Sequence, residues 1–190
     1  DRLIGEPAVS AAAPVQSPVF IVGFPRSGTT LIDQILSSHP RLLVLEEKES
    51  LYDALIDFLL PDAGLDRLAT LGAAALEGYR QKYWQRVDKF MPDRNNNHVF
   101  VDKLPLNTIF MPIIARLFPD ARFIFAVRDP RDVVLSCFMQ AFGLNEAMRH
   151  FLSLADTARY YAAVMDIAIH SMQRLQRSVH LLRYETLVDD

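Results

Sequence analysis

A glycine-bounded loop near the start of the chain has the composition of an anion-binding site. Residues 18–30 read PVFIVGFPRSGTT, and a second apolar stretch begins at Leu31. This order is typical of a buried strand, a tight loop and a helix whose first turn opens at the loop. Backbone N–H groups in such a loop hold a phosphate or similar oxyanion, assisted by the positive end of the helix dipole. The loop residues expected to bind the anion are Arg26, Ser27, Gly28, Thr29 and Thr30.

This loop differs from the P-loop of nucleoside triphosphatases at one position that matters. Gly23 and Gly28 have the spacing of the G-x-x-x-x-G-K-[ST] pattern, but Thr29 stands where that pattern has lysine. That lysine contacts the β- and γ-phosphates in P-loop enzymes. The only cation of the loop, Arg26, lies before the second glycine. We therefore expect a nucleotide whose reactive end is not a magnesium-bound triphosphate.

Other cations stand at the ends of apolar segments. Lys103, Arg128 and Arg183 occupy such positions, as Arg26 does. In a parallel sheet the carboxyl ends of the strands meet at one edge, and ligands bind there. Each cation taken singly could be a solvated surface charge. Four of them at one edge, beside an anion-binding loop, predict a ligand rich in negative charge.

Alternating strand and helix patterns predict the sheet that positions these residues. Apolar runs at 19–22, 42–45, 98–102, 122–127 and 179–182 are typical of buried strands. Helices are expected between and after them, at 31–38, 50–60, 65–90, 106–118, from Pro130 onward, over 146–174 and again after Arg183. This alternation predicts an α/β fold in three layers, a parallel β-sheet flanked by helices.

The composition excludes several classes of protein. The chain has 190 residues, of which 51% are hydrophobic and 23% charged, as in one globular domain. Twenty basic and 23 acidic residues give a net charge of −3, which argues against a nucleic-acid partner. No apolar run approaches the ~20 residues of a membrane-spanning helix, so no membrane association is expected. The single cysteine, Cys137, forms no disulfide within the chain and favours a reducing, cytoplasmic location.

The two ends of the chain suggest a longer protein. Residues 1–17 lack the continuous apolar core of a signal peptide and are expected to form a linker. Residues 18–190 are expected to form the domain, incomplete at its C-terminus because the chain stops just after a helix start.

Two motifs resemble those of the sulfotransferases that use 3′-phosphoadenosine 5′-phosphosulfate (PAPS). PVFIVGFPRSGTTLI resembles the family's 5′-phosphosulfate loop, and RFIFAVRDPRDVVLS resembles its 3′-phosphate motif. PRSGTT followed by His39-Pro40 and a double glutamate is most similar to the protein-tyrosine sulfotransferases. It is also similar to bacterial proteins with a sulfotransferase domain behind tetratricopeptide repeats. The resemblance implies the P-loop-like sulfotransferase fold and, for the bacterial type, such repeats upstream in the full-length protein.

The resemblance also assigns the donor site. It implies that Arg128 and Ser136 bind the 3′-phosphate, which distinguishes PAPS from ATP, through charge-assisted hydrogen bonds. Tyr184 matches a family tyrosine that contacts the nucleotide. The family needs no metal, so protein donors, Arg26 among them, must meet the charge that develops on the bridging oxygen. The expected product is adenosine 3′,5′-bisphosphate (PAP).

The acceptor hydroxyl needs a general base. In the tyrosyl branch this is the second glutamate of a pair, which here is Glu47, with Glu46 as the alternative. A third interpretation is that both glutamates form the acidic first turn of a helix. Lys103 stands where small-molecule sulfotransferases have a histidine base. Because lysine is a poor base unless its pKa is strongly lowered, Lys103 is expected to stabilise the leaving group. The acceptor itself, whether tyrosine, sugar or small phenol, stays open.

Two other functions compete with sulfuryl transfer. A P-loop kinase or NTPase would use Asp129 to hold magnesium, although Thr29 and the adjacent Arg128 argue against it. A non-catalytic nucleotide-binding scaffold would keep the fold without turnover, although Glu47 and Lys103 argue against that.

Three further residues lie within or just after the second motif. Arg131 is either a second ligand of the 3′-phosphate or the ion-pair partner of Asp129 or Asp132. Cys137 is expected to be a core residue. The tyrosyl branch has a basic residue where this chain has Gln140.

Overall fold

A parallel sheet forms the centre of the molecule. The computed structural model describes residues 17–95, 97–143, 145, 147–175 and 178–189. Within these ranges five strands pair in parallel in the order β2-β3-β1-β4-β5. All five predicted strands and the α/β fold class are confirmed. The strands are β1 (Val19–Gly23), β2 (Leu42–Glu46), β3 (Val99–Lys103), β4 (Arg122–Val127) and β5 (Val179–Arg183).

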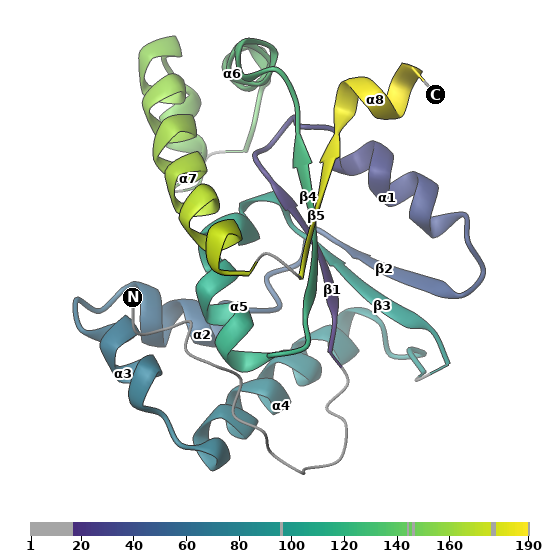
Figure 1. Ribbon diagram of the computed structural model, residues 1–190, viewed down its shortest axis with the longest axis vertical. Helices are drawn as coiled ribbons and strands as arrows, with labels where there is room; N and C mark the ends of the chain where they lie inside the picture. Colours follow the sequence, from purple (N-terminus) through teal and green to yellow (C-terminus); the bar gives the residue numbers. More distant parts are fainter. Residues whose placement is uncertain (1–16, 96, 144, 146, 176–177, 190) are drawn as a thin grey trace.

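Helices cover both faces of this sheet, which gives the three layers that the sequence predicts (Figure 1). One face carries α1 and α8, whose apolar side chains pack with Ile21, Val101 and Ala126 of the sheet. The opposite face carries the larger core, in which Phe20, Phe123 and their neighbours meet the remaining long helices. The helices are α1 (Thr29–Ser37), α2 (Tyr52–Ala54), α3 (Gly64–Thr70), α4 (Ala73–Phe90), α5 (Met111–Leu117), α6 (Pro130–Met139), α7 (Leu154–Arg174) and α8 (Tyr184–Asp189).

Three expected helices differ in detail from those observed. The helix expected over 50–60 starts at Tyr52 and continues as a π-helical turn, Leu55–Leu59, and the one over 106–118 starts as a 3₁₀ helix, Pro105–Phe110. The helix expected over 65–90 is interrupted because Leu71 and Gly72 have extended backbone.

The helix expected over 146–174 is confirmed from Leu154 to Arg174, but it begins later than expected. A 3₁₀ turn, Met148–Phe151, comes first, and α7 starts after Ser153, whose hydroxyl accepts the N–H of Asp156 at 3.1 Å. Serine in this position caps a helix and so begins a new one. The start expected at residue 146 lies outside the described residues, as does nearly all of the linker expected over 1–17.

The sheet order creates a crevice at the end of β1. From β1 the chain crosses to β2 through α1 on one face, and from β3 to β4 through α5 on the other face. Loops that leave neighbouring strands therefore diverge at this edge, which is the usual ligand site of such sheets. Buried Thr108 fixes the exit of β1, because its hydroxyl accepts the Gly23 N–H at 2.8 Å and lies 2.7 Å from the Gly23 carbonyl oxygen.

Two kinds of feature are absent from the described part of the chain. No helix there is both long and apolar enough to cross a membrane. No group of three or more histidine, cysteine, aspartate or glutamate side chains there is arranged to hold a metal ion.

Candidate active site

The predicted anion loop connects β1 to α1. The nine-residue helix α1 has Gly28 at its N-cap with a φ of 95°, a left-handed conformation that favours glycine. The first N–H groups of a helix have no partner within it, so those of α1 open toward the loop. Ser27 and Thr29 are buried, whereas Arg26 and Thr30 are exposed. The loop therefore has the form that the sequence predicts for oxyanion binding.

Tyr184 joins this loop to the second motif. A Cβ added at Gly28 would lie 2.5 Å from a ring carbon of Tyr184, so only glycine allows the ring to pack against the loop. The guanidinium carbon of Arg128 lies 4.7 Å from the centre of the same ring. The first residue of α8 thus lies between the two motifs, although it is 156 positions from Gly28 in the sequence.

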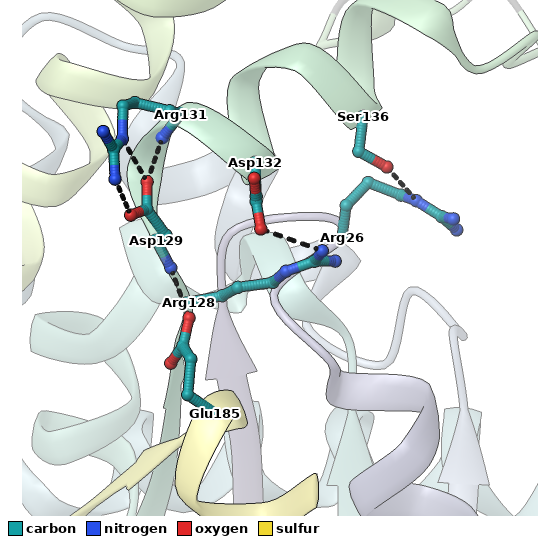
Figure 2. Close-up of polar contacts among 7 residues, drawn as sticks. All are labelled: Arg26, Arg128, Asp129, Arg131, Asp132, Ser136 and Glu185. Carbon is teal, nitrogen blue, oxygen red and sulfur yellow. Dashed lines mark hydrogen bonds and ion pairs between the residues drawn. The ribbon is translucent and has the colours of Figure 1, made fainter.

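The second motif brings its cation and its hydroxyl to the same side of α6 (Figure 2). Arg128 donates to Asp132 Oδ2 at 3.2 Å, while its buried Nε atom has no hydrogen-bond partner among the described residues. Arg26 of the loop donates from Nε to Ser136 Oγ at 3.1 Å. This contact between the two motifs was not predicted: it places the loop cation beside the hydroxyl expected to hold the 3′-phosphate.

Asp129 and Arg131 lie apart from that arrangement. Figure 2 shows both residues across the first turn of α6 from Arg26 and Ser136. The Asp129 carboxylate caps α6 by accepting the Arg131 N–H at 2.9 Å, and it pairs with the Arg131 guanidinium at 2.6 Å. These bonds to Arg131 hold the pKa of Asp129 well below its usual range. The ion-pair alternative for Arg131 is therefore the one observed, and Asp129 is already engaged rather than free for magnesium.

Lys103 lies beneath the two glutamates at the end of the neighbouring strands. Its side chain is fully buried, and Nζ donates to Glu46 Oε1 at 2.9 Å and to Glu47 Oε1 at 3.0 Å. Asp33 of α1, which sequence reasoning missed, lies 3.8 Å from the same atom. Both glutamates precede α2, which starts only at Tyr52, so the interpretation that they form its first turn is wrong. They instead place two exposed carboxylates over one buried ammonium group.

Glu46 and Glu47 differ in their backbones. Glu46 is the last residue of β2 and pairs in register with Lys103. Glu47 has a φ of 47°, which is strained for a residue with a side chain, and donates its N–H to the Lys103 carbonyl at 2.7 Å. The turn that this conformation produces carries Glu47 beyond the edge of the sheet, over the cavity.

One cavity of about 520 Å³ joins these parts. The cavity is lined by the anion loop, both glutamates, Arg128 and Tyr184. Most of the predicted site residues therefore meet in one place. Ser136 lines an adjoining hollow together with Arg128 and Asp132. Lys103 lies behind the glutamates, and Arg183 is exposed and does not line either space. Of the four strand-end cations, three belong to the site and Arg183 does not.

Comparison with known proteins agrees with this geometry. A model of the sulfotransferase family matches residues 18–190. The chain belongs to this family. A sulfotransferase, STF9 from Mycobacterium avium, superposes with a TM-score of 0.58 at 18% identity, over 94% of this chain and 61% of that one, which shows a shared sulfotransferase fold.

Relatives in sequence come from distant organisms. An uncharacterized protein of Aquifex aeolicus is 32% identical over 150 residues, which are 73% of this chain and 19% of that protein. A putative protein-tyrosine sulfotransferase of Caenorhabditis briggsae is 30% identical over 125 residues, which are 62% of this chain and 41% of that protein. The chain thus spans less than half the length of the curated relatives that it matches.

The sulfotransferase cavity also has an apolar wall that sequence reasoning missed. Leu106, Phe142 and Met148 line the cavity and pack from behind against a small core that contains Phe24 and Cys137. Burial in this core raises the pKa of the Cys137 thiol to about 12, so the core interpretation of this cysteine is confirmed. The three wall residues belong to no motif, and their apolar character is ordinary for a core, so nothing in the sequence marked them.

Proposed function

We propose that this member of the sulfotransferase family transfers a sulfuryl group from PAPS to an acceptor hydroxyl without a metal ion. The observation that carries the proposal is the single cavity shared by the anion loop, Arg128 and the Lys103–glutamate cluster. A donor with a phosphosulfate at one end and a 3′-phosphate at the other presents anions to both motifs. The reacting sulfur would then lie between the loop and the glutamates.

The 3′-phosphate site consists of Arg128 and Ser136, with Arg26 close by. The buried Nε of Arg128 supports this role, because it has no hydrogen-bond partner among the described residues and an oxygen of the 3′-phosphate would supply one. Arg26 already touches the Ser136 hydroxyl, so it can bind either phosphate group of the donor. Tyr184, packed on Gly28 and beneath Arg128, offers a ring next to the nucleotide.

Transfer needs a base on one side of sulfur and a cation on the other. As the acceptor oxygen bonds to sulfur, the bond from sulfur to the bridging oxygen breaks, and its electron pair stays on the 5′-phosphate of PAP. Glu47 takes the acceptor proton. Arg26 and the loop N–H groups stabilise the negative charge on the leaving group. Lys103, which is buried behind the glutamates, holds the Glu47 carboxylate in place and does not contact the leaving group.

The acceptor side favours an aromatic alcohol. Leu106, Phe142 and Met148 offer an apolar wall to whatever lies over Glu47. Apolar side chains of this kind bind a flat ring better than a sugar, whose many hydroxyls would lose their hydrogen bonds to water. We therefore place tyrosine-like and small phenols before carbohydrates as acceptors.

Calorimetric binding tests the donor. PAP should bind tightly without metal, while ATP with Mg²⁺ and adenosine 5′-monophosphate should bind weakly. A preference for Mg-ATP would overturn the proposal in favour of a kinase. PAP binding without turnover on any hydroxyl acceptor would instead identify the non-catalytic scaffold.

A comparison of two acceptors tests whether the apolar wall of the cavity favours phenols. With PAPS as donor, 2-naphthol should be sulfated faster than N-acetylglucosamine, and Phe142→Ala should raise the KM for the phenol. Phe138→Ala, which removes an exposed α6 ring outside the cavity lining, is the matched control. Equal rates on both acceptors would contradict the phenol preference and leave the donor proposal intact.

A further inference from the structure

A buried polar cluster lies on the side of β3 opposite Lys103. Asp102 is fully buried, and one carboxylate oxygen, Oδ2, accepts two hydroxyl hydrogens, from Ser50 at 2.5 Å and from Tyr83 at 2.9 Å. Ser50 and Tyr83 are both 2% exposed. The other oxygen, Oδ1, is buried and has no partner among the described residues. Burial raises the pKa of this carboxyl to about 6, so its environment does not favour the charge.

The two donors to Asp102 come from different places. Tyr83 belongs to α4 and packs among aromatic side chains of the main core. Ser50 ends the short segment that begins with Glu46 and Glu47 and leads into α2. Only the Ser50 bond therefore connects Asp102 to the segment that carries the proposed base.

The end of β3 holds this segment from both faces of the sheet. Because side chains alternate along a strand, Lys103 points to the face of α1 and Asp102 to the face of α4. Lys103 binds the front of the segment, through the Glu47 N–H and through both glutamate side chains. Asp102 binds its far end through Ser50. Between these two attachments the chain makes the left-handed turn at Glu47.

We propose that the Asp102–Ser50 hydrogen bond is a positioning device that holds the left-handed turn and keeps the Glu47 carboxylate over the cavity. The inference rests on the proposed function, in which Glu47 is the base. A strained backbone conformation persists only where its surroundings enforce it. The bonds to Lys103 hold the segment only at Glu46 and Glu47, whereas the Asp102–Ser50 bond holds it three residues after Glu47, on the other side of the turn. Asp102 and Ser50 act through Glu47 and do not touch the reacting atoms.

A pair of matched variants separates this role from simple stability. Ser50→Ala and Tyr83→Phe each remove one hydroxyl donor to the same oxygen of Asp102. Because misplacing a catalytic group costs rate, Ser50→Ala should lower kcat by about tenfold or more with the affinity for PAP unchanged. Tyr83→Phe should lower the melting temperature at least as much as Ser50→Ala does, but its kcat should stay within about twofold of the wild-type value. Ser50→Thr, which keeps the hydroxyl, should restore most of the rate.

Variants of Glu47 complete the test. If Ser50 acts through Glu47, Ser50→Ala should cost nothing more in kcat when added to Glu47→Gln, because coupled residues are not additive. Independent losses in the double variant, equal losses of kcat in Ser50→Ala and Tyr83→Phe, or a parallel loss of PAP affinity would each overturn the positioning role. If Glu47→Gln had the same kcat as the wild-type protein, Glu47 would not be the base, and this inference would fail with that assignment. The donor proposal is tested separately, by PAP binding to the wild-type protein, and would be overturned if PAP did not bind.

Discussion

Two strand-end cations in this protein hold their carboxylate partners in different ways. Lys103, at the end of β3, is fully buried and bonds to Glu46 and Glu47. Arg128, just after β4, keeps 27% of its side chain exposed and pairs with Asp132, which is 57% exposed and lies in the first turn of α6. The sequence marks both cations in the same way, as basic residues at the end of an apolar run.

The difference matches the roles proposed for the two regions, a reacting centre around Lys103 and a binding site around Arg128. An exposed ion pair such as that of Arg128 is worth at most about 1 kcal/mol, so a phosphate can replace Asp132 at little cost. A buried ammonium group needs its partners, because leaving it unpaired costs several kcal/mol. Lys103 therefore keeps the two glutamates in one arrangement, whereas Arg128 is free to exchange its partner for a ligand.

The largest expected effect falls on the Lys103 region. Glu47→Gln removes the base but keeps a group of similar size, so kcat should fall by about two to four orders of magnitude. The affinity for PAP, measured by calorimetry, should stay within about threefold, since the carboxylate lies outside the donor motifs. Glu46→Gln is the matched control, and a larger loss in that variant would reassign the base to Glu46.

The buried neighbour of Lys103 should give the protein a pH-dependent stability. The folded-state pKa of Asp102 is about 6, above its unfolded value of 3.8, so its contribution is complete below pH 4 and is lost as the pH rises toward 6. Asp102→Asn lacks this loss. The variant's free energy of unfolding relative to wild type should therefore rise by roughly 2 kcal/mol between pH 4 and pH 7.

Urea unfolding at several pH values measures this change. Asp129→Asn is the opposite case, because the pKa of Asp129 is lowered by Arg131 and its contribution is lost as the pH falls. A parallel pH profile for Asp102→Asn and wild type would show that Asp102 carries no such penalty.

A smaller effect is expected at Arg128. Arg128→Ala should weaken PAP binding by about 10- to 100-fold, the value of one or two charge-assisted hydrogen bonds. Binding of adenosine 5′-monophosphate should barely change, because it lacks the 3′-phosphate. Arg131→Ala is a close control, since Arg131 is 89% exposed and paired with Asp129. A similar loss for both nucleotides, or for both variants, would contradict the 3′-phosphate assignment.

The smallest effect should come from the partner of Arg128. Asp132→Asn removes a carboxylate that competes with the 3′-phosphate, so PAP should bind about two- to fivefold more tightly, in keeping with the small worth of exposed pairs. The gain should shrink as salt concentration rises. Weaker binding in this variant would mean that Asp132 orients Arg128 instead of competing for it, and the contrast with Lys103 would lose its basis.

Local patterns in the sequence were enough to predict much of this protein. All five strands, the α/β class and the loop before α1 were predicted. This was possible because a buried parallel strand and a glycine loop each have a recognisable pattern within a short stretch of adjacent residues. The two motifs proposed to bind the donor were recognised by their resemblance to those of the PAPS-dependent sulfotransferases. The break before α7 was not recognised, since Ser153 caps a helix only where the chain turns, and one serine is a weak signal.

Tertiary structure alone decided the relations between distant segments. Arg26 meets Ser136 across 110 positions, Tyr184 packs on Gly28, and Phe142 reaches the cavity from a segment with no motif. The sequence by itself determined which residues could bind anions or take a proton. Which of them share a cavity, and that Lys103 is buried while Arg128 is not, depends on strand order and on helices packed from both faces. Strand order and helix packing result from many weak contacts between residues far apart in the chain, and no local sequence pattern predicts these contacts.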